Sequence, residues 1–303
     1  MSFILPELRA PLAQPWSPEW DLELTRRLND EAFADQHVSG PGTALNVIAV
    51  GDMEVRAWRP TGREPERVIY AVHGGGYTAG RAYYDDLRNA EMAAAFSALV
   101  ISPDYRLAPE HPFPIPAQDC LAGLDWAIDH AGELPLYLYG DSAGAGLVET
   151  IAAWHLDRDG RGLEGLICLE PAIDPLLRAA SLDRYSEGPL WSKEKAAASW
   201  DCYLAGQDPS VLPRLADRAE KAPPVLVFIN PVDPLRDEGA AWAFGLADAG
   251  VRVEMHMMPG SYHSALSISG TRTWERVQGI IYTFMEVFAE NRVEVRPTIH
   301  SDL

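Results

Sequence analysis

Apolar runs alternate with amphipathic segments along most of this 303-residue chain. Short runs rich in β-branched and aromatic residues are typical of strands, and they occur at residues 68–72, 98–102, 136–139, 166–169, 225–229 and 251–257. Helical patterns lie between most of them, at 86–96, 117–129, 145–156 and 238–249, and a last long helix is expected from about 270 to 290. Strands that are apolar on both faces and alternate with helices predict an α/β fold with a mostly parallel sheet and helices on both faces.

Two parts of the chain depart from this alternation. Residues 44–50 and 53–59 predict an antiparallel hairpin at one edge of the sheet. Residues 1 to about 40 show no strand pattern, and neither do residues 176–216, which are rich in Trp, Tyr and Leu. Because ligands bind at the carboxyl ends of parallel strands, we expect these two segments to form a small helical cap on a single domain spanning 1–303.

Composition and charge narrow the possible partners. The formal net charge of −19 disfavours nucleic acid and anionic membrane surfaces, since both would repel the chain. No apolar run approaches the roughly 20 residues that a membrane-spanning helix needs, and the first residues lack a signal-peptide pattern. Cys120, Cys168 and Cys202 are odd in number and far apart, which suits a reducing compartment. We therefore expect a cytoplasmic protein with no nucleic-acid partner and no stable membrane anchoring.

The most informative motif is the pentapeptide Gly-Asp-Ser-Ala-Gly at 140–144. It follows the apolar run at 136–139 and directly precedes a helical pattern. A sharp strand-to-helix turn holds a serine hydroxyl out toward a base, and small residues two before and two after the serine let the turn close. Ser142 is therefore a candidate nucleophile, and a buried serine that caps a helix is the alternative.

A nucleophilic serine needs a base and an acid that orients the base. Asp233 lies just past the apolar run at 225–229, and His263 lies in a turn after the run at 251–257. The order Ser, Asp, His at successive strand ends is that of α/β-hydrolases. Asp237 is a competing acid, but its place near the start of the next helical pattern favours a capping role.

The sequence also offers donors for an oxyanion. The motif His-Gly-Gly-Gly-Tyr at 73–77 follows the apolar run at 68–72, and its glycines let backbone N–H groups approach a substrate carbonyl closely. The N–H of Ala143 would complete such an oxyanion hole. The loop lacks the lysine of a P-loop and the spacing of a dinucleotide site. The histidines have no metal-ligand spacing, so no cofactor and no metal are expected.

Together these motifs resemble those of the hormone-sensitive lipase family of α/β-hydrolases, esterases that carry HGGG upstream of GDSAG. The resemblance spans roughly residues 65 to 290 and includes DYRLAPEHPFP at 104–114 and DPLRDEG at 233–239. It implies an α/β-hydrolase fold whose cap is built from the N-terminal helices and the segment after the sixth strand, and members that often dimerise, which makes a homodimer a candidate assembly. The functional residues it implies are a triad of Ser142, Asp233 and His263 and an oxyanion hole of Gly75, Gly76 and Ala143.

Three departures from the family pattern lie around the site. Ala145 stands where glycine usually follows the pentapeptide, and Ser264 and Ala265 follow the histidine in place of glycine and phenylalanine. Asn230 opens an unusual Asn-Pro-Val lead-in to the catalytic acid. None of these changes removes a catalytic atom. Those near the histidine are expected to affect substrate preference more than mechanism.

The sequence thus predicts a serine carboxylesterase that hydrolyses small to medium acyl esters through an acyl-enzyme. An acyltransferase, lyase or cyclase on the same fold is the first alternative, and a non-catalytic ligand receptor is the second. From the ordinary imidazole pKa near 6.5, activity is expected to fall below about pH 6 as His263 is protonated. The aromatic candidates to line the substrate pocket, with ordinary cap packing as the alternative, are Tyr77, Tyr84, Trp191 and Tyr203.

Overall fold

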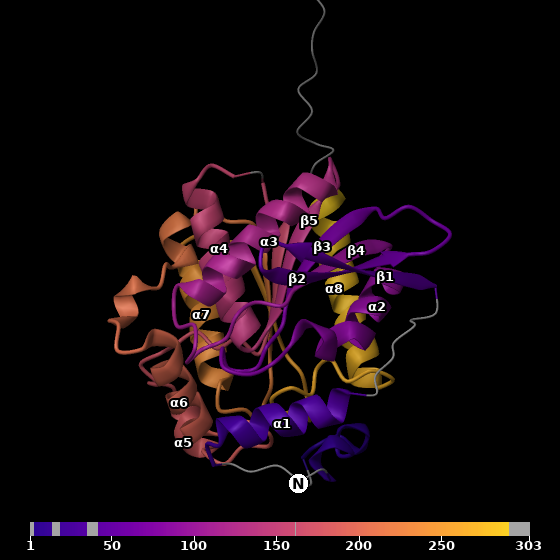
Figure 1. The fold of residues 1–303 in the computed structure, drawn as a ribbon. Helices are drawn as coiled ribbons and strands as arrows, with labels where there is room; N and C mark the ends of the chain where they lie inside the picture. Colours follow the sequence, from indigo (N-terminus) through magenta and orange to yellow (C-terminus); the bar gives the residue numbers. More distant parts are fainter. Residues whose placement is uncertain (1–2, 14–18, 35–41, 161, 291–303) are drawn as a thin grey trace, which may run out of the picture.

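Eight strands form one continuous sheet in the structure, a computed structural model that describes residues 3–13, 19–34, 42–160 and 162–290 (Figure 1). β1 pairs with β2, and β2 with β4, in antiparallel fashion, whereas the other neighbouring strands are parallel. The mostly parallel sheet with a hairpin at one edge is therefore confirmed. In sheet order the strands are β1 (Thr43–Val50), β2 (Met53–Pro60), β4 (Ala98–Pro103), β3 (Arg67–Val72), β5 (Leu136–Asp141), β6 (Gly165–Leu169), β7 (Val225–Ile229) and β8 (Val253–Met257).

The edge strand β8 begins later than the sequence pattern indicates, at Val253. The N–H of Val251 donates to the carbonyl of Leu246 at 3.0 Å, and Gly250 before it has a φ of 97°. A glycine with positive φ commonly ends a helix. These residues therefore complete the end of α7 (Arg236–Asp248) before the strand starts.

Helices pack on both faces of the sheet, as predicted, because successive strand residues point to opposite sides. On one face, strand residues such as Val68 and Tyr70 share a buried core with α3 (Ile115–Ala131), α4 (Ala143–Asp157) and α7. On the other face, Ile69 and Ala71 pack with α2 (Asp86–Ala95) and α8 (Arg272–Glu290). Full burial of a Val or Ile side chain, as at Val68 and Ile69, stabilises the fold by about 1.5–3 kcal/mol. The two-sided core fixes where the strand ends, and hence the loops, lie.

Short helices gather at one end of the molecule. Figure 1 shows α1 (Leu22–Phe33), α5 (Ala180–Arg184) and α6 (Lys193–Leu204) at the same end. The chain between β6 and β7 contains helices and irregular structure but no strand, as predicted, and this stretch is described throughout. The remaining short helices are of the 3-10 type, at Pro6–Leu8, Pro11–Ala13, Ala82–Asp85, Pro209–Val211 and Leu215–Arg218.

Helix α1 is attached to the rest of the molecule largely by polar contacts. None of its residues is buried. Arg26 donates to the carbonyl oxygens of Thr78 at 2.8 Å and Ala108 at 2.9 Å. Its guanidinium also pairs with Glu110 at 2.7 Å. These contacts place α1 beside the loop that follows β3.

Within the described ranges, no helix is both long enough and apolar enough to cross a membrane. The three cysteines are free thiols. Cys120 and Cys168 are buried, and Cys202 is partly exposed.

Candidate active site

The turn between β5 and α4 holds Ser142 in an uncommon backbone conformation. Its φ is 53° and its ψ is −119°, and such conformations cost a residue other than glycine about 1–3 kcal/mol. The N–H of Ser142 donates to the carbonyl of Leu169 at the end of β6, at 2.8 Å. Gly144 has no room for a side chain, because a Cβ there would lie 2.2 Å from the carbonyl oxygen of Val72. The predicted strand-to-helix turn is formed, and it presents the serine hydroxyl to the loops after β7 and β8.

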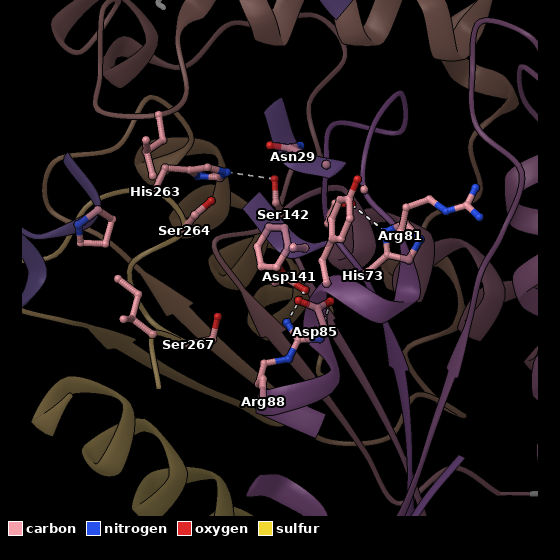
Figure 2. Close-up of a pocket in the computed structure, with 18 of the residues that line it drawn as sticks. Asn29, His73, Arg81, Asp85, Arg88, Asp141, Ser142, His263, Ser264 and Ser267 are labelled. Carbon is pink, nitrogen blue, oxygen red and sulfur yellow. Dashed lines mark hydrogen bonds and ion pairs between the residues drawn. The ribbon is translucent and has the colours of Figure 1, made fainter. Parts of the chain in front are cut away.

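Side chains from three loops meet at one buried point, part of which is drawn in Figure 2. The Oγ of Ser142 lies 3.0 Å from Nε2 of His263, and Nδ1 of the same ring lies 3.0 Å from Oδ2 of Asp233. Each of these three residues is at most 5% exposed. The N–H of Leu235 donates to the other carboxylate oxygen of Asp233 at 2.8 Å. A nucleophile, a base and an orienting acid are thus within hydrogen-bond reach of one another.

The charges around His263 favour its protonated form. Burial alone would lower the pKa of the imidazole, but the carboxylates of Asp233 and Glu170 outweigh burial and raise that pKa to about 9. The indole ring of Trp191 stacks on the imidazole, with ring centroids 5.6 Å apart. The pH expectation taken from an isolated imidazole therefore needs correction. Activity should begin to fall well above pH 6, because protonation of His263 begins at higher pH.

Glu170, Asp233 and His263 bring donor atoms within 4.8 Å of one another, a spacing that could hold a metal ion. Both ring nitrogens of His263, however, lie within hydrogen-bond distance of Ser142 and Asp233. A metal ligand must offer a free lone pair. The arrangement therefore favours proton transfer over metal binding.

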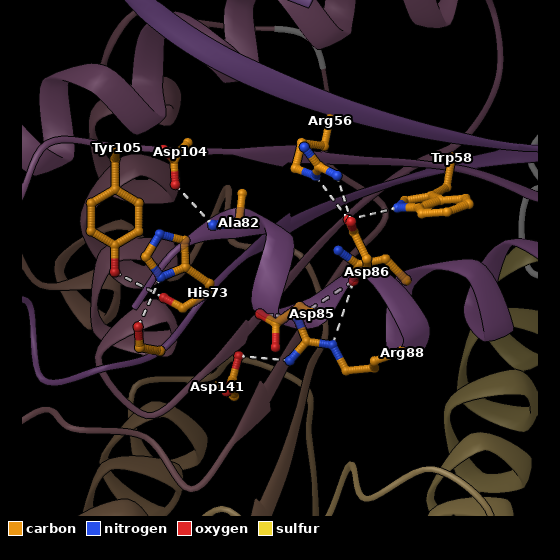
Figure 3. Close-up of polar contacts among 12 residues, drawn as sticks. Arg56, Trp58, His73, Ala82, Asp85, Asp86, Arg88, Asp104, Tyr105 and Asp141 are labelled. Carbon is orange, nitrogen blue, oxygen red and sulfur yellow. Dashed lines mark hydrogen bonds and ion pairs between the residues drawn. The ribbon is translucent and has the colours of Figure 1, made fainter. Parts of the chain in front are cut away.

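The glycine loop after β3 faces the nucleophile. Gly75 and Gly76 line the same cavity as the serine, and Gly75 has a φ of 111°, which side-chain-bearing residues rarely adopt. Ala143 is the first residue of α4, where N–H groups have no partner within the helix. Within the described part of the chain, these three backbone N–H groups donate to no other group. His73 and Tyr105, stacked with centroids 4.1 Å apart, hold the start of the loop (Figure 3).

Figure 3 shows a cluster of charged side chains formed by Arg88, Asp85 and Asp141. Arg88 is 4% exposed, and its guanidinium donates to Asp141 at 3.0 Å and to Asp85 at 2.8 Å. The same guanidinium lies 4.8 Å from the ring centroid of Tyr139. Burial raises the pKa of Asp85 to about 7 despite the neighbouring cation. Arg88 thus holds together two carboxylates, one of which belongs to the residue before Ser142.

A cavity of about 520 Å³ opens over Ser142 and His263. Of the aromatic residues predicted to line the pocket, Tyr84 and Trp191 do so. No residue of α1 or of the segment before it was predicted to line the cavity, because no local sequence pattern shows that α1 packs here. Arg81 and Asp85 were not predicted either, although their position just after the glycine loop is a usable signal. Lining residues beyond those predicted include Pro11, Asn29, Phe33, Arg81, Asp85, Leu190, Ser264, Ser267 and Ile268.

Tyr77 and Tyr203 lie outside this cavity, contrary to the prediction from sequence. Their rings stack on each other with centroids 4.0 Å apart, and both residues are at most 2% exposed. The hydroxyl of Tyr77 donates to the carbonyl of Ala172 at 2.9 Å. Trp200 packs against the same pair. Burial of these large rings together, with a partner for the Tyr77 hydroxyl, accounts for their place in the core.

Asp233 rather than Asp237 contacts the histidine. Asp237 lies in the first turn of α7 and pairs with Arg236 at 2.7 Å. The N-cap residue is Leu235, which makes no side-chain cap, and the N–H of Asp237 itself donates to the Oγ of Ser181 at 3.0 Å. The predicted capping role of Asp237 is therefore wrong. An acidic residue in the first turn still interacts favourably with the helix dipole.

Comparison with known proteins assigns the family. A family model described as the alpha/beta hydrolase fold matches residues 69–267, more than half of the chain. A solved esterase from the bacterial hormone-sensitive lipase family has a TM-score of 0.79 and 25% sequence identity, over 93% of this chain and 95% of that one. The chain belongs to the hormone-sensitive lipase family of α/β-hydrolases.

Two further similarities lie within the esterases. This hormone-sensitive lipase family member is similar to a structure titled bacterial heroin esterase, with a TM-score of 0.86 and 28% identity, over 95% of this chain and 98% of the other. It is 32% identical over 235 residues to LipN of Mycobacterium tuberculosis, named a carboxylic ester hydrolase. That match covers 72% of this chain and 62% of LipN, so the chain spans less than two thirds of that relative's length.

Proposed function

We propose that this carboxylic ester hydrolase of the hormone-sensitive lipase family is a serine carboxylesterase with Ser142 as its nucleophile. His263 takes the proton of the Ser142 hydroxyl as the oxygen attacks the ester carbonyl, and it then protonates the leaving alcohol. A water molecule activated by the same imidazole hydrolyses the acyl-enzyme. Asp233 keeps the proton of the ring on Nδ1 and stabilises the imidazolium.

The oxyanion of each tetrahedral intermediate binds to the backbone N–H groups of Gly75, Gly76 and Ala143. Their freedom from other hydrogen bonds within the described residues supports this role. Donors fixed in place stabilise the charge that develops in the transition state, and losing one of them costs about 3 kcal/mol. The turn at Ser142 sets the third donor beside the nucleophile, since Ala143 is the next residue.

The substrate is an ester with a small to medium acyl group. The cavity of about 520 Å³ supports this size, which lies in the lower part of the range for small-molecule sites. Its walls combine apolar side chains, among them Phe33, Leu190 and Trp191, with polar groups such as Asn29 and Ser267. The esterases to which the chain is similar support the same class.

The observation that carries this proposal is the unbroken chain of 3.0 Å contacts from Ser142 through His263 to Asp233. Its test is turnover of p-nitrophenyl esters of graded acyl length by the wild-type protein and by Ser142→Ala. We expect the wild type to hydrolyse short and medium esters and the variant to lose essentially all turnover while keeping its fold by circular dichroism. Turnover retained in Ser142→Ala would overturn the assignment.

The same samples separate hydrolysis from acyl transfer and from non-catalytic ligand binding. Adding an acceptor alcohol distinguishes an acyltransferase, which would yield a new ester in place of the free acid. A fluorophosphonate should label one serine per chain, whereas a non-catalytic receptor would remain unlabelled. The assembled Ser142–His263 pair supports catalysis over the receptor alternative.

We also propose that residues 1 to about 40 and 176–216 act as a cap of the single domain. Pro11, Asn29 and Trp191, from these segments, line the cavity. Residues 1–2, 14–18 and 35–41 lie outside the described residues. A homodimer is a further proposal, which size-exclusion chromatography tests; β8 is an edge strand of the sheet and edge strands can pair with another chain. The three free cysteines support a cytoplasmic location.

A further inference from the structure

A second buried carboxylate, that of Glu170, lies beside the proposed triad. Glu170 directly follows β6, is 3% exposed and has a positive φ of 42°. One of its oxygens accepts the N–H of Ser264, the residue after the catalytic histidine, at 2.8 Å. The cluster that it forms with Asp233 and His263 has donor atoms within 4.8 Å of one another. An acid buried this completely, with no Lys or Arg among the described residues bonded to it, calls for an explanation.

Asn230 connects this carboxylate to the triad. Its Nδ2 donates to Glu170 and, at 3.1 Å, to Oδ2 of Asp233. Its Oδ1 lies 2.5 Å from the hydroxyl of Ser261, which fixes the amide so that its NH₂ group faces the two acids. Asn230 and Ser261 are fully buried. The two carboxylates therefore share one amide and are held at fixed positions relative to each other.

We propose that Glu170 is a positioning residue of this esterase, which holds the His263 loop in place and stabilises the imidazolium jointly with Asp233. The inference rests on the proposed roles of Ser142, Asp233 and His263. When the Ser142 hydroxyl gives its proton to Nε2 of His263, the new positive charge lies near two acids instead of one. The N–H contact from Ser264 holds that loop against the end of β6 at the same time.

The charges around the cluster agree with this role. Burial raises the pKa of Glu170 to about 7, although the charge of His263 opposes the shift. The other groups that face the cluster are Asp233 and, at the end of β5, Asp141, both of which raise the pKa of His263 and of Glu170. Tyr262 is the neighbouring phenol, and its pKa is raised to about 12 by burial and by Glu170. Groups this close titrate together, so the protonation of His263 depends on the charge of Glu170.

This role also accounts for two departures of the sequence from its family. Asn230, in the unusual lead-in to Asp233, supplies the shared amide. Ser264 stands in place of glycine with a φ of 68°, a costly value for serine, and its N–H is turned toward Glu170. Both residues contact the same carboxylate. We therefore attribute them to the acid cluster rather than to substrate choice alone.

The test is the pH dependence of kcat/KM, which reports the pKa of the essential base in the free enzyme. Glu170→Gln removes the charge but keeps the size and the acceptor for Ser264. We expect its acid-limb midpoint to fall by about one pH unit or more, as for the loss of an opposite charge next to an ionisable group. Glu170→Asp keeps a carboxylate and should stay closer to wild type. The matched control is Glu149→Gln, which also removes a buried carboxylate, one bonded to Leu215 and Trp242 and not to the triad.

A positioning role further predicts that kcat of Glu170→Gln falls several-fold with little change in KM, since the lost interaction forms in the transition state. A midpoint equal to that of wild type overturns the inference. The proposed function then still stands if Ser142→Ala is inactive, so the two failures are distinguishable. If Glu170→Gln does not fold, the pH midpoint of His263 protonation is measured instead, from the proton NMR resonance at Nδ1 in the wild type and in Glu170→Asp. A wild-type midpoint at or below the ordinary imidazole pKa of 6.5 also overturns the inference.

Discussion

The ion-pair cluster of Arg88, Asp85 and Asp141 allows a prediction whose magnitude follows from the burial of Arg88. Arg88→Met keeps most of the length of the side chain but removes its guanidinium. Asp141 and Asp85, now 3.0 Å and 2.8 Å from that group, would face each other without a cation. The ring of Tyr139 would also lose its cation. Breaking a buried pair by removing one partner typically costs about 3–5 kcal/mol.

That cost is a large share of the roughly 5–15 kcal/mol that stabilises a typical folded protein. A matched control is Arg158→Met. Arg158 pairs with Asp125 at 2.7 Å, yet the two side chains are 45% and 48% exposed. A pair this exposed is worth about 0–1 kcal/mol. The two variants therefore compare a buried arginine bonded to two carboxylates with an exposed arginine bonded to one.

The assay is equilibrium unfolding in urea, measured for both variants at several pH values. The deficit of Arg88→Met should be largest in alkaline solution, where both carboxylates are charged. It should shrink as the pH falls through the pKa of Asp85, about 7 in the wild type because of burial and higher without the cation. A loss no larger than that of Arg158→Met, or a loss independent of pH, would refute the reasoning.

Three other variants test further features, each with its measurement. Gly144→Ala should abolish esterase activity, because the added Cβ would lie 2.2 Å from a backbone carbonyl oxygen. In the control Gly279→Ala the added Cβ would meet no described atom within 4 Å beyond its chain neighbours and its own helix backbone, so activity should stay intact and α8 should gain up to about 1 kcal/mol of stability. Burial raises the pKa of Glu238 to about 8, so the wild type loses stability as the pH rises from about 4.5 to that value. Glu238→Gln should therefore show a weaker dependence of Tm on pH over this range, measured by thermal unfolding at several pH values. Trp191→Ala should shift relative kcat/KM toward bulkier acyl esters, since the indole of Trp191 lines the cavity. The control Trp154→Ala, at a tryptophan partly buried in the core, should leave the acyl preference unchanged. An unchanged acyl preference in Trp191→Ala would contradict its role in the cavity.

The order of strands and helices was predictable because it depends on local patterns. Apolar runs on both faces and small residues at the strand-to-helix turn are visible without tertiary information. The motifs that carry Ser142, Asp233 and His263 stand at strand ends, and the parallel sheet brings strand ends together. Their 3.0 Å contacts then follow from the fold.

Properties that depend on side-chain direction or on distant segments could not be predicted. Tyr77 follows the glycine loop and looked like a pocket residue, yet it packs into the core against Tyr203. Asn29 lines the cavity because Arg26 on the same helix reaches the carbonyl of Thr78, far along the chain. The raised pKa of His263 depends on Asp233 and also on Glu170, whose signal in the sequence is only that of an acid directly after a buried strand.

The weak burial of α1 has an evolutionary consequence. The helix supplies Asn29 and Phe33 to the wall of the cavity, yet none of its residues is buried. Polar side chains do much of its anchoring, Arg26 among them and Asp30, which accepts from the hydroxyls of Tyr83 and Tyr84. Mutations on its cavity side can therefore accumulate without disturbing the cores on which folding depends. Descendants of this sequence can acquire new substrates by changing this helix while Ser142 and its partners stay as they are.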